Sequence, residues 1–545
     1  MMSLSTIDFT VLLAYILFII WWALKNGKTE NSDDYFLAGR NLSWPMIGLS
    51  LFAASVSSST LMGHSGEGFI SGIAVFNYNW ISVLVLAFFA TFFLPFYIRS
   101  GIFTMPEFLE RRFDGRSRTY FSFITIIGNV FLDAAATLYT GALIIKMIFP
   151  EAEIVWIIIG MAAVAGSYTI IGGLSSAINA DMIQATILII GSGLLFFFAL
   201  KNIGGWETFV ERFNDGFWLK LTRPLDDPTV PWLGMWVGIP ILGFYFWANN
   251  QVMVQRVLSA KSVDHGRKGV LLVGFLYLLT IFIFIIPGLI ARGIDLYGVE
   301  NLPHKIISGS VLKQEYGINT DQVYPRLILE LLPIGLIGII LSAMISALTS
   351  TLSATLSSVS TLFTMDFYSK IDKNASSKKK VQVGQFTAVI TLIIAVIWAP
   401  YIREFDSLIA YYQEIVSYLA PPIVGTFFLG LFWKRANGTG AITGLFSGLF
   451  VAATIMIMKY TFDIDMGLHF LLLAPILLVI SLFITIVISL VTSPPSEEKV
   501  VENTWTVKIW KEETKAMKEV VWYKNFRVQV VALIIACFGM YAAFF

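Results

Sequence analysis

Charged residues are scarce in this chain. Only 13% of its 545 residues are Asp, Glu, Lys or Arg, which is about half the share that soluble domains carry. Apolar residues make up 57% of the sequence, and the mean hydropathy is +0.76. Because so few charges cannot cover a water-facing surface of this size, the composition predicts an integral membrane protein.

The sequence also lacks the residues of several other chemistries. Its 37 basic and 36 acidic residues give a net charge of +1, so no nucleic-acid partner is expected, since phosphate backbones bind basic patches. Cys537 is the single cysteine and can form neither an internal disulfide nor a cysteine cluster for a metal. Three absences argue against an enzyme. The four histidines do not have H-E-x-x-H spacing, and no P-loop is present. The segment Gly66-Glu67-Gly68 does not match the G-x-S-x-G motif of serine hydrolases.

Apolar runs long enough to cross a membrane recur along the whole chain. A helix needs about 20 apolar residues to span the hydrocarbon core, and the sequence predicts fourteen such spans. The first is interpreted as a span rather than as a cleaved signal peptide. The predicted spans are residues 7–25, 43–71, 77–98, 119–149, 153–175, 179–200, 232–255, 268–294, 326–365, 380–401, 405–433, 439–459, 466–492 and 525–545.

Basic residues are distributed unevenly between the two sides of this predicted membrane protein. One set of loops and span ends holds 26 of the 37 Lys and Arg residues. Because cytoplasmic loops are enriched in Lys and Arg, both termini are expected outside the cytoplasm, in the plasma (inner) membrane. The segment 494–524 is then a cytoplasmic linker with an amphipathic helix.

Two predicted spans contain residues that do not suit a lipid-facing helix. In the stretch 51–72, serines accompany His64 and Glu67, and Gly63, Gly66 and Gly68 lower the helix propensity. We therefore expect an interruption there, whose freed carbonyls face a protein-lined cavity.

The second unusual span begins five spans later. Residues 238–251 combine glycine and proline with Asn249 and Asn250. Paired interrupted helices in two halves of a chain indicate a binding site near the bilayer midplane of a secondary transporter. The predicted organisation has two five-span units, residues 43–200 and 232–433, and the second contains the outer loop 295–325. A first helix with its loop (1–42) precedes them, and an outer loop (201–231) lies between them. Two peripheral helices (434–493), the linker (494–524) and a last helix (525–545) follow.

Hydroxyl groups concentrate in the ninth predicted span. Residues 342–360 carry many serines and threonines and no charge. Small residues of this kind also serve helix packing. However, a sodium ion prefers about five oxygen ligands, and hydroxyls beside the carbonyls of an interrupted helix supply them without a full charge. Together with the interrupted helices, the pattern favours a sodium site.

Several motifs resemble those of the sodium/solute symporter family, and within it the sodium-coupled sugar transporters. They occur in the family's order at residues 34–40, 50–54, 104–113, 172–175, 181–184, 255–256, 363–366 and 429–433. The resemblance implies an all-helical membrane protein with the LeuT-type five-plus-five inverted repeat and flanking helices. It also implies sodium-driven uptake of a small solute by alternating access.

The resemblance further implies a set of sodium ligands. These are the backbone carbonyls of Ala53, Val56 and Ala347 and the hydroxyls of Ser350 and Thr351.

A second sodium site, or a path for the ion, is implied less completely. Asp181 matches the family's aspartate at the cytoplasmic start of a span, and intramembrane carboxylates often mark ion paths. Ser353 matches one serine of members that bind a second sodium, but Ala354 interrupts that pattern. The number of sodium ions therefore stays open.

The solute positions differ from those of the bacterial galactose transporter, so galactose itself is not expected. Gly243 replaces one of its sugar-contacting side chains, and Asp133 either accepts hydroxyl or ammonium hydrogens or caps a helix. Aromatic residues there, and Trp80, either stack on a sugar ring or pack the helices. The expected solute-binding residues are Thr60, Tyr78, Asn79, Asp133, Phe246, Trp247, Tyr277 and Gln413.

Two further polar residues have alternative interpretations. Glu67 lies near a glutamate of the iodide, monocarboxylate and vitamin transporters of the family, which favours an anionic solute, whereas no Lys or Arg is expected near the cavity. His64 is interpreted as a satisfied polar residue rather than a proton carrier. We therefore expect sodium-coupled import of a sugar or polyol, with an organic anion, amino acid or inorganic anion as the alternative solute. A channel or a substrate sensor remains the competing class, and no obligate protein partner is expected beyond the lipid bilayer.

Overall fold

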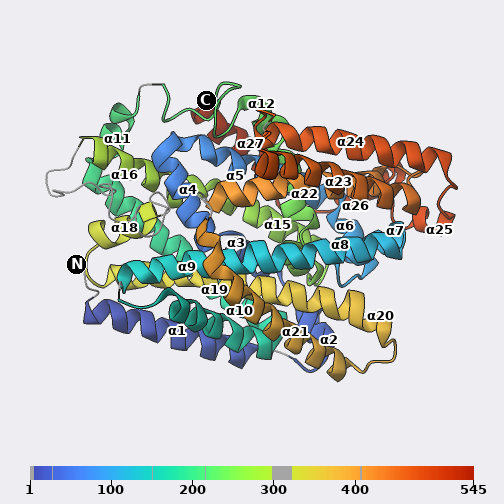
Figure 1. The fold of residues 1–545 in the computed structure, drawn as a ribbon, viewed down its shortest axis with the longest axis horizontal. Helices are drawn as coiled ribbons and strands as arrows, with labels where there is room; N and C mark the ends of the chain where they lie inside the picture. The colour runs from blue at the N-terminus through green and yellow to red at the C-terminus, as the bar shows by residue number, and fades with distance from the viewer. Residues whose placement is uncertain are drawn as a thin grey trace.

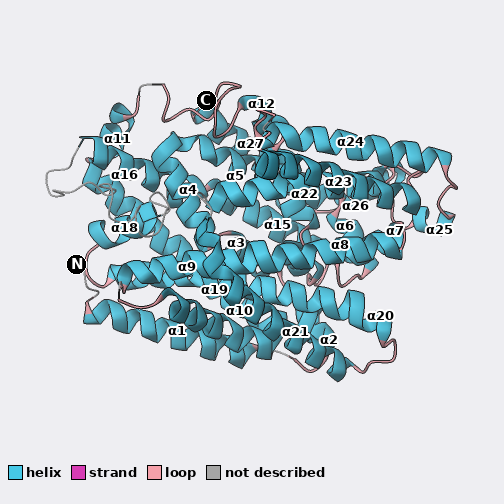
Figure 2. Cartoon of the chain, in the orientation of Figure 1, coloured by secondary structure: helices cyan, strands magenta, loops and turns pink. Residues whose placement is uncertain are grey.

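The computed structural model describes residues 5–27, 29–149, 151–214, 216–297, 322–404, 408–464 and 466–544. Within these ranges the regular structure is helical, and the one β-type pairing is the isolated bridge between Leu42 and Ala260. The helices lie side by side in one bundle, most of them running along its long axis (Figures 1 and 2). The expected all-helical fold is confirmed.

The helices vary widely in length. Their bounds are α1 Thr6–Asn26, α2 Ser32–Leu37, α3 Trp44–Ser55, α4 Ser58–Ser71, α5 Asn77–Phe92, α6 Leu94–Ser100, α7 Met105–Arg112, α8 Gly115–Gly128, α9 Ala135–Ile148, α10 Ile154–Ile203, α11 Trp206–Arg212, α12 Trp232–Val237, α13 Ile239–Phe244, α14 Gln251–Leu258, α15 Val263–Leu278, α16 Ile286–Tyr297, α18 Val323–Leu331, α19 Leu336–Leu362, α20 Ser369–Ile371, α21 Ser377–Trp398, α22 Leu408–Phe432, α23 Gly438–Phe462, α24 Phe470–Val491, α25 Glu497–Val501, α26 Val507–Met517 and α27 Phe526–Ala543. Wider π-helical turns occur at η3 Asn129–Ala134, η4 Tyr245–Asn249, η5 Ile281–Ile285 and η7 Phe363–Tyr368.

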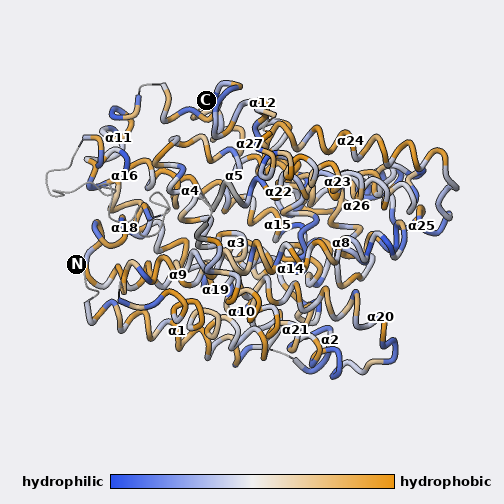
Figure 3. The backbone as a smooth tube through the Cα atoms, viewed as in Figure 1, coloured by the Kyte–Doolittle hydropathy of each residue, from blue (hydrophilic) through white to orange (hydrophobic). Residues whose placement is uncertain are grey.

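Eleven helices in the described ranges are long and apolar enough to cross a membrane. The difference from the fourteen predicted spans has local causes. The spans 153–175 and 179–200 form one helix, α10, which bends at Gly173, where φ is 56°. Hydrophobic residues line the helices along most of their length (Figure 3), as a lipid environment requires.

The first interrupted span breaks at Val56 and Ser57, between α3 and α4. Val56 leaves the helical region with φ −97° and ψ 80°, and the Ser57 hydroxyl caps α4 by accepting from the amide of Thr60 at 3.1 Å. The interruption predicted within residues 51–72 is therefore confirmed. It precedes Gly63, Gly66 and Gly68, which lie inside α4.

Gly68 lies at a close helix contact. A Cβ atom on Gly68 would lie 2.5 Å from the backbone oxygen of Ile285, and one on Gly288 would lie 2.0 Å from the backbone oxygen of Ser65. Helices α4 and α16 therefore touch through their backbones. This close approach explains why α4 has a glycine at position 68.

The second interrupted span breaks at Asn250, within the predicted stretch 238–251. The π turn η4 precedes it, Asn250 is extended with φ −68° and ψ 124°, and α14 begins at the next residue. The Asn250 side chain caps α14 by accepting from the amide of Val252 at 2.9 Å. Pro240 does not cause the break, because it occupies the first turn of α13, where no helical donor is needed.

Helix α19 carries the hydroxyl-rich segment and lies buried among α1, α3 and α10. Several of its hydroxyls bond within the helix, as Ser342 does to the oxygen of Gly338 at 2.7 Å and Thr361 to that of Ser357 at 2.7 Å. Others reach neighbouring helices. The packing and site interpretations of this segment therefore apply to different hydroxyls.

Candidate functional site

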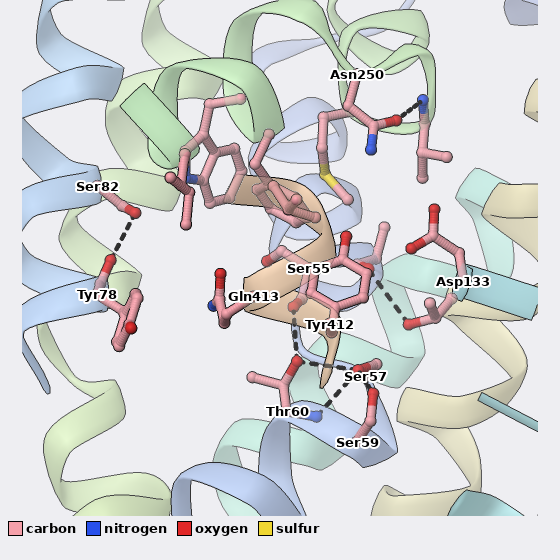
Figure 4. A pocket seen from close by; sticks show the side chains of 18 of the residues that line it. Ser55, Ser57, Ser59, Thr60, Tyr78, Ser82, Asp133, Asn250, Tyr412 and Gln413 are labelled. Carbon is pink, nitrogen blue, oxygen red and sulfur yellow. Dashed lines mark hydrogen bonds between the residues drawn. The ribbon is translucent and has the colours of Figure 1, made fainter. Parts of the chain in front are cut away.

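A cavity lies between the two helix breaks. Ser57 and Thr60 at the first break and Phe246 and Asn250 at the second line it, and α5, η3, α15, α19 and α22 complete its wall. Figure 4 shows polar side chains from several of these elements directed into one space. All eight residues expected to bind solute line this cavity: Thr60, Tyr78, Asn79, Asp133, Phe246, Trp247, Tyr277 and Gln413.

One side of the cavity is a hydroxyl cluster at the start of α4. The Ser57 hydroxyl lies 2.7 Å from that of Ser59 and 2.9 Å from that of Thr60. Hydroxyl groups both donate and accept hydrogen bonds. This cluster suits a ligand with several hydroxyl groups.

The opposite side is aromatic. Trp247 packs edge-on against Phe246 and against Tyr277, with ring centroids 5.0 Å apart in each pair. Because Trp247 is only 2% exposed, it forms the wall through its packing. Trp80 is not in the cavity: it is fully buried, packs against Tyr541 and donates to Asn77 at 2.6 Å. Of the two interpretations of Trp80, helix packing is the one that these contacts support.

Thr351, one of the expected sodium ligands, lies where α19 contacts the end of α3. The Thr351 hydroxyl lies 3.2 Å from the backbone oxygen of Ala54 and 3.0 Å from that of Ala347. Ala53 and Val56 flank Ala54 at the last turn of α3, where carbonyls run out of helical partners. Ser350 is adjacent to Thr351 on α19 and donates to Asp181 at 2.5 Å. The hydroxyl uses its one hydrogen in this bond, so the lone pairs of its oxygen remain available to a cation.

Asp181 is held in an ion pair that the sequence reasoning missed. Its carboxylate accepts from Arg256 at 3.0 Å and from Ser50 at 2.5 Å, and neither Asp181 nor Arg256 is exposed. The motif 255–256 could have predicted this pair, because its arginine is a charge at membrane depth and requires a partner of opposite charge. The Ser353 hydroxyl accepts from the Thr169 hydroxyl of α10 at 2.7 Å. Ser353 therefore contacts α10 through this bond and not the end of α3.

The two remaining candidates are separated by the fold. His64 lines the cavity, and its Nδ1 lies 3.0 Å from the backbone oxygen of Thr60 in its own helix. Glu67 is outside the cavity lining and contacts Ser71, whose hydroxyl lies 3.4 Å from its carboxylate. The structure thus removes Glu67 from the set that surrounds the cavity.

A second buried network explains further family motifs. Asp366 accepts from Arg118 at 2.6 Å and from Thr104 at 2.7 Å. Gln251, the first residue of α14, bonds to both neighbours of Thr104. Its side-chain oxygen accepts from the amide of Met105 at 2.8 Å, and its side-chain nitrogen donates to the backbone oxygen of Phe103 at 3.1 Å. These contacts connect α7, α8, α14 and η7, and they do not line the cavity.

Comparison with known proteins places these features in context. Residues 35–448 match the model of the Sodium:solute symporter family. Sodium/glucose cotransporter 1 of Oryctolagus cuniculus is 33% identical over 548 residues, which cover 93% of this chain and 82% of that protein. The sodium/myo-inositol cotransporter of Homo sapiens is 33% identical over 568 residues, which cover 95% of this chain and 77% of that protein.

Solved structures share the fold. A Na⁺-coupled sialic acid symporter in a substrate-bound outward-open state matches 90% of this chain and 99% of its own chain, with a TM-score of 0.78 and 22% identity. Mhp1, a nucleobase-cation-symport-1 family transporter, matches with a TM-score of 0.54 and 12% identity. The architecture is that of LeuT-type symporters.

The family match covers most of the chain, and the relatives named above span nearly all of it. These proteins are transporters, and sodium-coupled import of a solute across a membrane follows for this chain. The chain belongs to the sodium:solute symporter family.

Proposed function

We propose that this symporter imports a small polyhydroxylated solute, a sugar or polyol, together with sodium. The observation that carries the proposal is the cavity itself, which lies between two helix breaks and combines the hydroxyl cluster of α4 with an aromatic wall. Relatives at 33% identity are a glucose and a myo-inositol cotransporter, which supports a solute of this class.

In this proposal sodium binds to the carbonyls of Ala53, Val56 and Ala347 and the hydroxyls of Ser350 and Thr351. The ion then joins α3, next to the first break, to α19. Because α3 leads directly into the hydroxyl cluster of α4, a bound ion stabilises the conformation in which the solute cavity is complete. Coupling follows, since solute and ion favour the same state.

The energetics suffice for accumulation. One positive charge moving inward through about 100 mV releases about 2.3 kcal/mol, and a tenfold sodium gradient adds about 1.4 kcal/mol. One ion per solute therefore supports roughly 500-fold accumulation.

We also propose that both termini lie outside the cytoplasm, in the plasma (inner) membrane. Both ends of the chain lie in the left half of Figure 1, whereas α2, α20 and α25, which belong to the segments rich in Lys and Arg, lie in the right half. This arrangement supports the orientation expected from the basic residues.

An anionic solute is the less favoured alternative. None of the described residues that line the cavity is Lys or Arg, and Glu67 lies outside the lining. A carboxylate or iodide would therefore have the sodium ion as its main counter-charge.

The test is uptake into proteoliposomes with an imposed sodium gradient. Radiolabelled glucose, myo-inositol, an amino acid, a monocarboxylate and iodide are compared, with potassium replacing sodium in the control. We expect sodium-dependent, current-carrying uptake of a polyhydroxylated probe. Sodium current that persists without solute at about 10⁵ charges per second would indicate a channel, and solute binding without uptake would indicate a sensor.

A further inference from the structure

Asp133 brings a carboxylate to the wall of the solute cavity. It belongs to the π turn η3, inside the membrane-spanning segment Gly115–Ile148. In Figure 4 its carboxylate is directed into the space between Asn250 and Tyr412. An acidic side chain therefore forms part of the wall that a solute in the cavity would meet.

Two other buried carboxylates of the bundle are each paired with an arginine. Asp181 is paired with Arg256 at 3.0 Å, and Asp366 is paired with Arg118 at 2.6 Å. Each of these acids also accepts from two hydroxyl groups. In both cases a guanidinium provides the balancing charge.

Asp133 has neutral partners. Tyr412 lies near its carboxylate in the wall of the cavity. The side-chain nitrogen of Asn129 lies 3.2 Å from its Oδ2 in the amide orientation that also accepts from Ser358 at 2.8 Å. Among the described residues that line the cavity there is no Lys or Arg, so these neighbours bring polar groups but no positive charge.

A carboxylate in a protein-lined membrane cavity is costly unless a cation compensates it. Hydroxyl groups of a neutral sugar would donate hydrogen bonds to a carboxylate but would not neutralise its charge. A protonated amine provides hydrogen bonds and a positive charge together, in charge-assisted hydrogen bonds. We propose that the solute is a polyhydroxylated molecule carrying a protonated amino group, which binds to Asp133. This inference rests on the proposed function and narrows its solute class.

The experiment compares probes that differ in the amine. D-glucosamine, at a pH at which its amine is protonated, is paired with N-acetyl-D-glucosamine and with D-glucose in sodium-driven uptake into proteoliposomes. The measured quantity is the ratio of apparent affinities for the charged and the neutral probe. We expect the full-length protein to prefer glucosamine at least tenfold.

Two variants assign that preference to one carboxylate. D133N keeps the shape of the side chain and is expected to reduce the ratio at least tenfold. D264N removes a charge from an exposed cytoplasmic carboxylate that is paired with Lys268 and is expected to leave the ratio unchanged. The wild-type comparison does not depend on whether either variant folds.

Several outcomes would overturn the inference. Equal uptake of charged and neutral probes by the wild type overturns it while the proposed function stands. A sodium Hill coefficient that falls in D133N without a change in the probe ratio would instead assign Asp133 to a second cation. Absence of sodium-dependent uptake for glucosamine, glucose and myo-inositol alike would overturn both this inference and the proposed function.

Discussion

Arg256 donates through Nη2 to Oδ2 of Asp181 at 3.0 Å, and neither side chain has any exposed surface. Oδ1 of the same carboxylate accepts from Ser350 at 2.5 Å. The ion pair therefore connects α14, which follows the second helix break, to α10 and to the hydroxyl that we propose as a sodium ligand. A single buried network therefore joins α14 and α10 to the proposed sodium site.

Removal of the Arg256 charge is expected to destabilise the protein strongly. R256Q leaves the Asp181 carboxylate buried without its cation, which costs about 3–5 kcal/mol of unfolding free energy. The double variant D181N/R256Q, in which both groups are neutral, is expected to recover a large part of this loss. Thermal unfolding of the detergent-solubilised protein, followed by tryptophan fluorescence, measures both effects.

The pair of Lys268 and Asp264 provides the control. These residues lie 2.7 Å apart on the exposed side of α15, where solvent weakens an ion pair. K268A is expected to change the stability by about 0–1 kcal/mol. Equal unfolding temperatures for R256Q and K268A would contradict the structural importance of the buried pair.

The features that the sequence predicted well are those with a strong local cause. Polar residues and helix-breaking patterns in spans 43–71 and 232–255 predicted both interruptions, because unpaired backbone groups in a membrane need a protein-lined cavity. The position of the first break was harder to predict. It depends on the cap that Ser57 provides for α4, whereas Gly68, one of the glycines that suggested a break, lies against the backbone of Ile285.

Partners distant in sequence were the least predictable part of the site. Asp181 and Arg256 each stood in a family motif, but only the packing of α10 against α3 and α14 shows that they touch. Trp80 illustrates the converse, because its neighbours in sequence line the cavity while its own ring turns away towards Tyr541 of the last helix. Periodicity identifies spans and leaves the rotation of each helix undetermined.

The proposed sodium ligands make a direct prediction about ion affinity. S350A and T351A each remove one oxygen ligand, so each is expected to raise the sodium concentration for half-maximal uptake about tenfold, which corresponds to about 1.4 kcal/mol. T351S keeps the hydroxyl and is expected to remain near the wild type. Uptake into proteoliposomes over a range of sodium concentrations provides the measurement.

A hydroxyl on the same helix serves as the control for these variants. Ser342 donates to the backbone oxygen of Gly338 in its own helix, so S342A is expected to leave the sodium dependence unchanged. An unchanged half-saturating concentration in both S350A and T351A would refute the assignment of the site.

The contact between α4 and α16 makes a prediction about packing. G288A places a methyl group where the backbone oxygen of Ser65 lies 2.0 Å away, so the helices must separate. We expect a loss of about 1–3 kcal/mol, as for overpacked cores. By comparison, G193A adds a methyl group on α10 where no atom lies within 4 Å and is expected to be neutral or to stabilise by about 0.5–1 kcal/mol. Thermal unfolding temperatures of the two variants would distinguish this contact from a general intolerance of the helices to alanine.

Glu110 on helix α7 makes a prediction about pH. Partial burial raises the pKa of its carboxyl group, but hydrogen bonds and charge attraction from Arg118 and Lys370 outweigh burial, so the pKa lies below its ordinary value of 4.5. A carboxyl group with a lowered pKa in the folded protein contributes stability that is present above the unfolded pKa and is lost as the pH falls through the folded value.

The stabilising effect of Glu110 is therefore expected to be complete at neutral pH and to disappear below about pH 4.5. E110Q should unfold more easily than the wild type at pH 7, by about 1 kcal/mol or less because solvent screens this partly exposed pair. The two proteins should converge as the pH falls through the lowered pKa of Glu110 in the folded protein. E512Q, in which the exposed partner Lys508 lies 4.0 Å away, is the control and should follow the wild type at every pH. A difference between E110Q and the wild type that grows at low pH would mean that the ionised form of Glu110 opposes folding, which would contradict its pairing with Arg118 and Lys370.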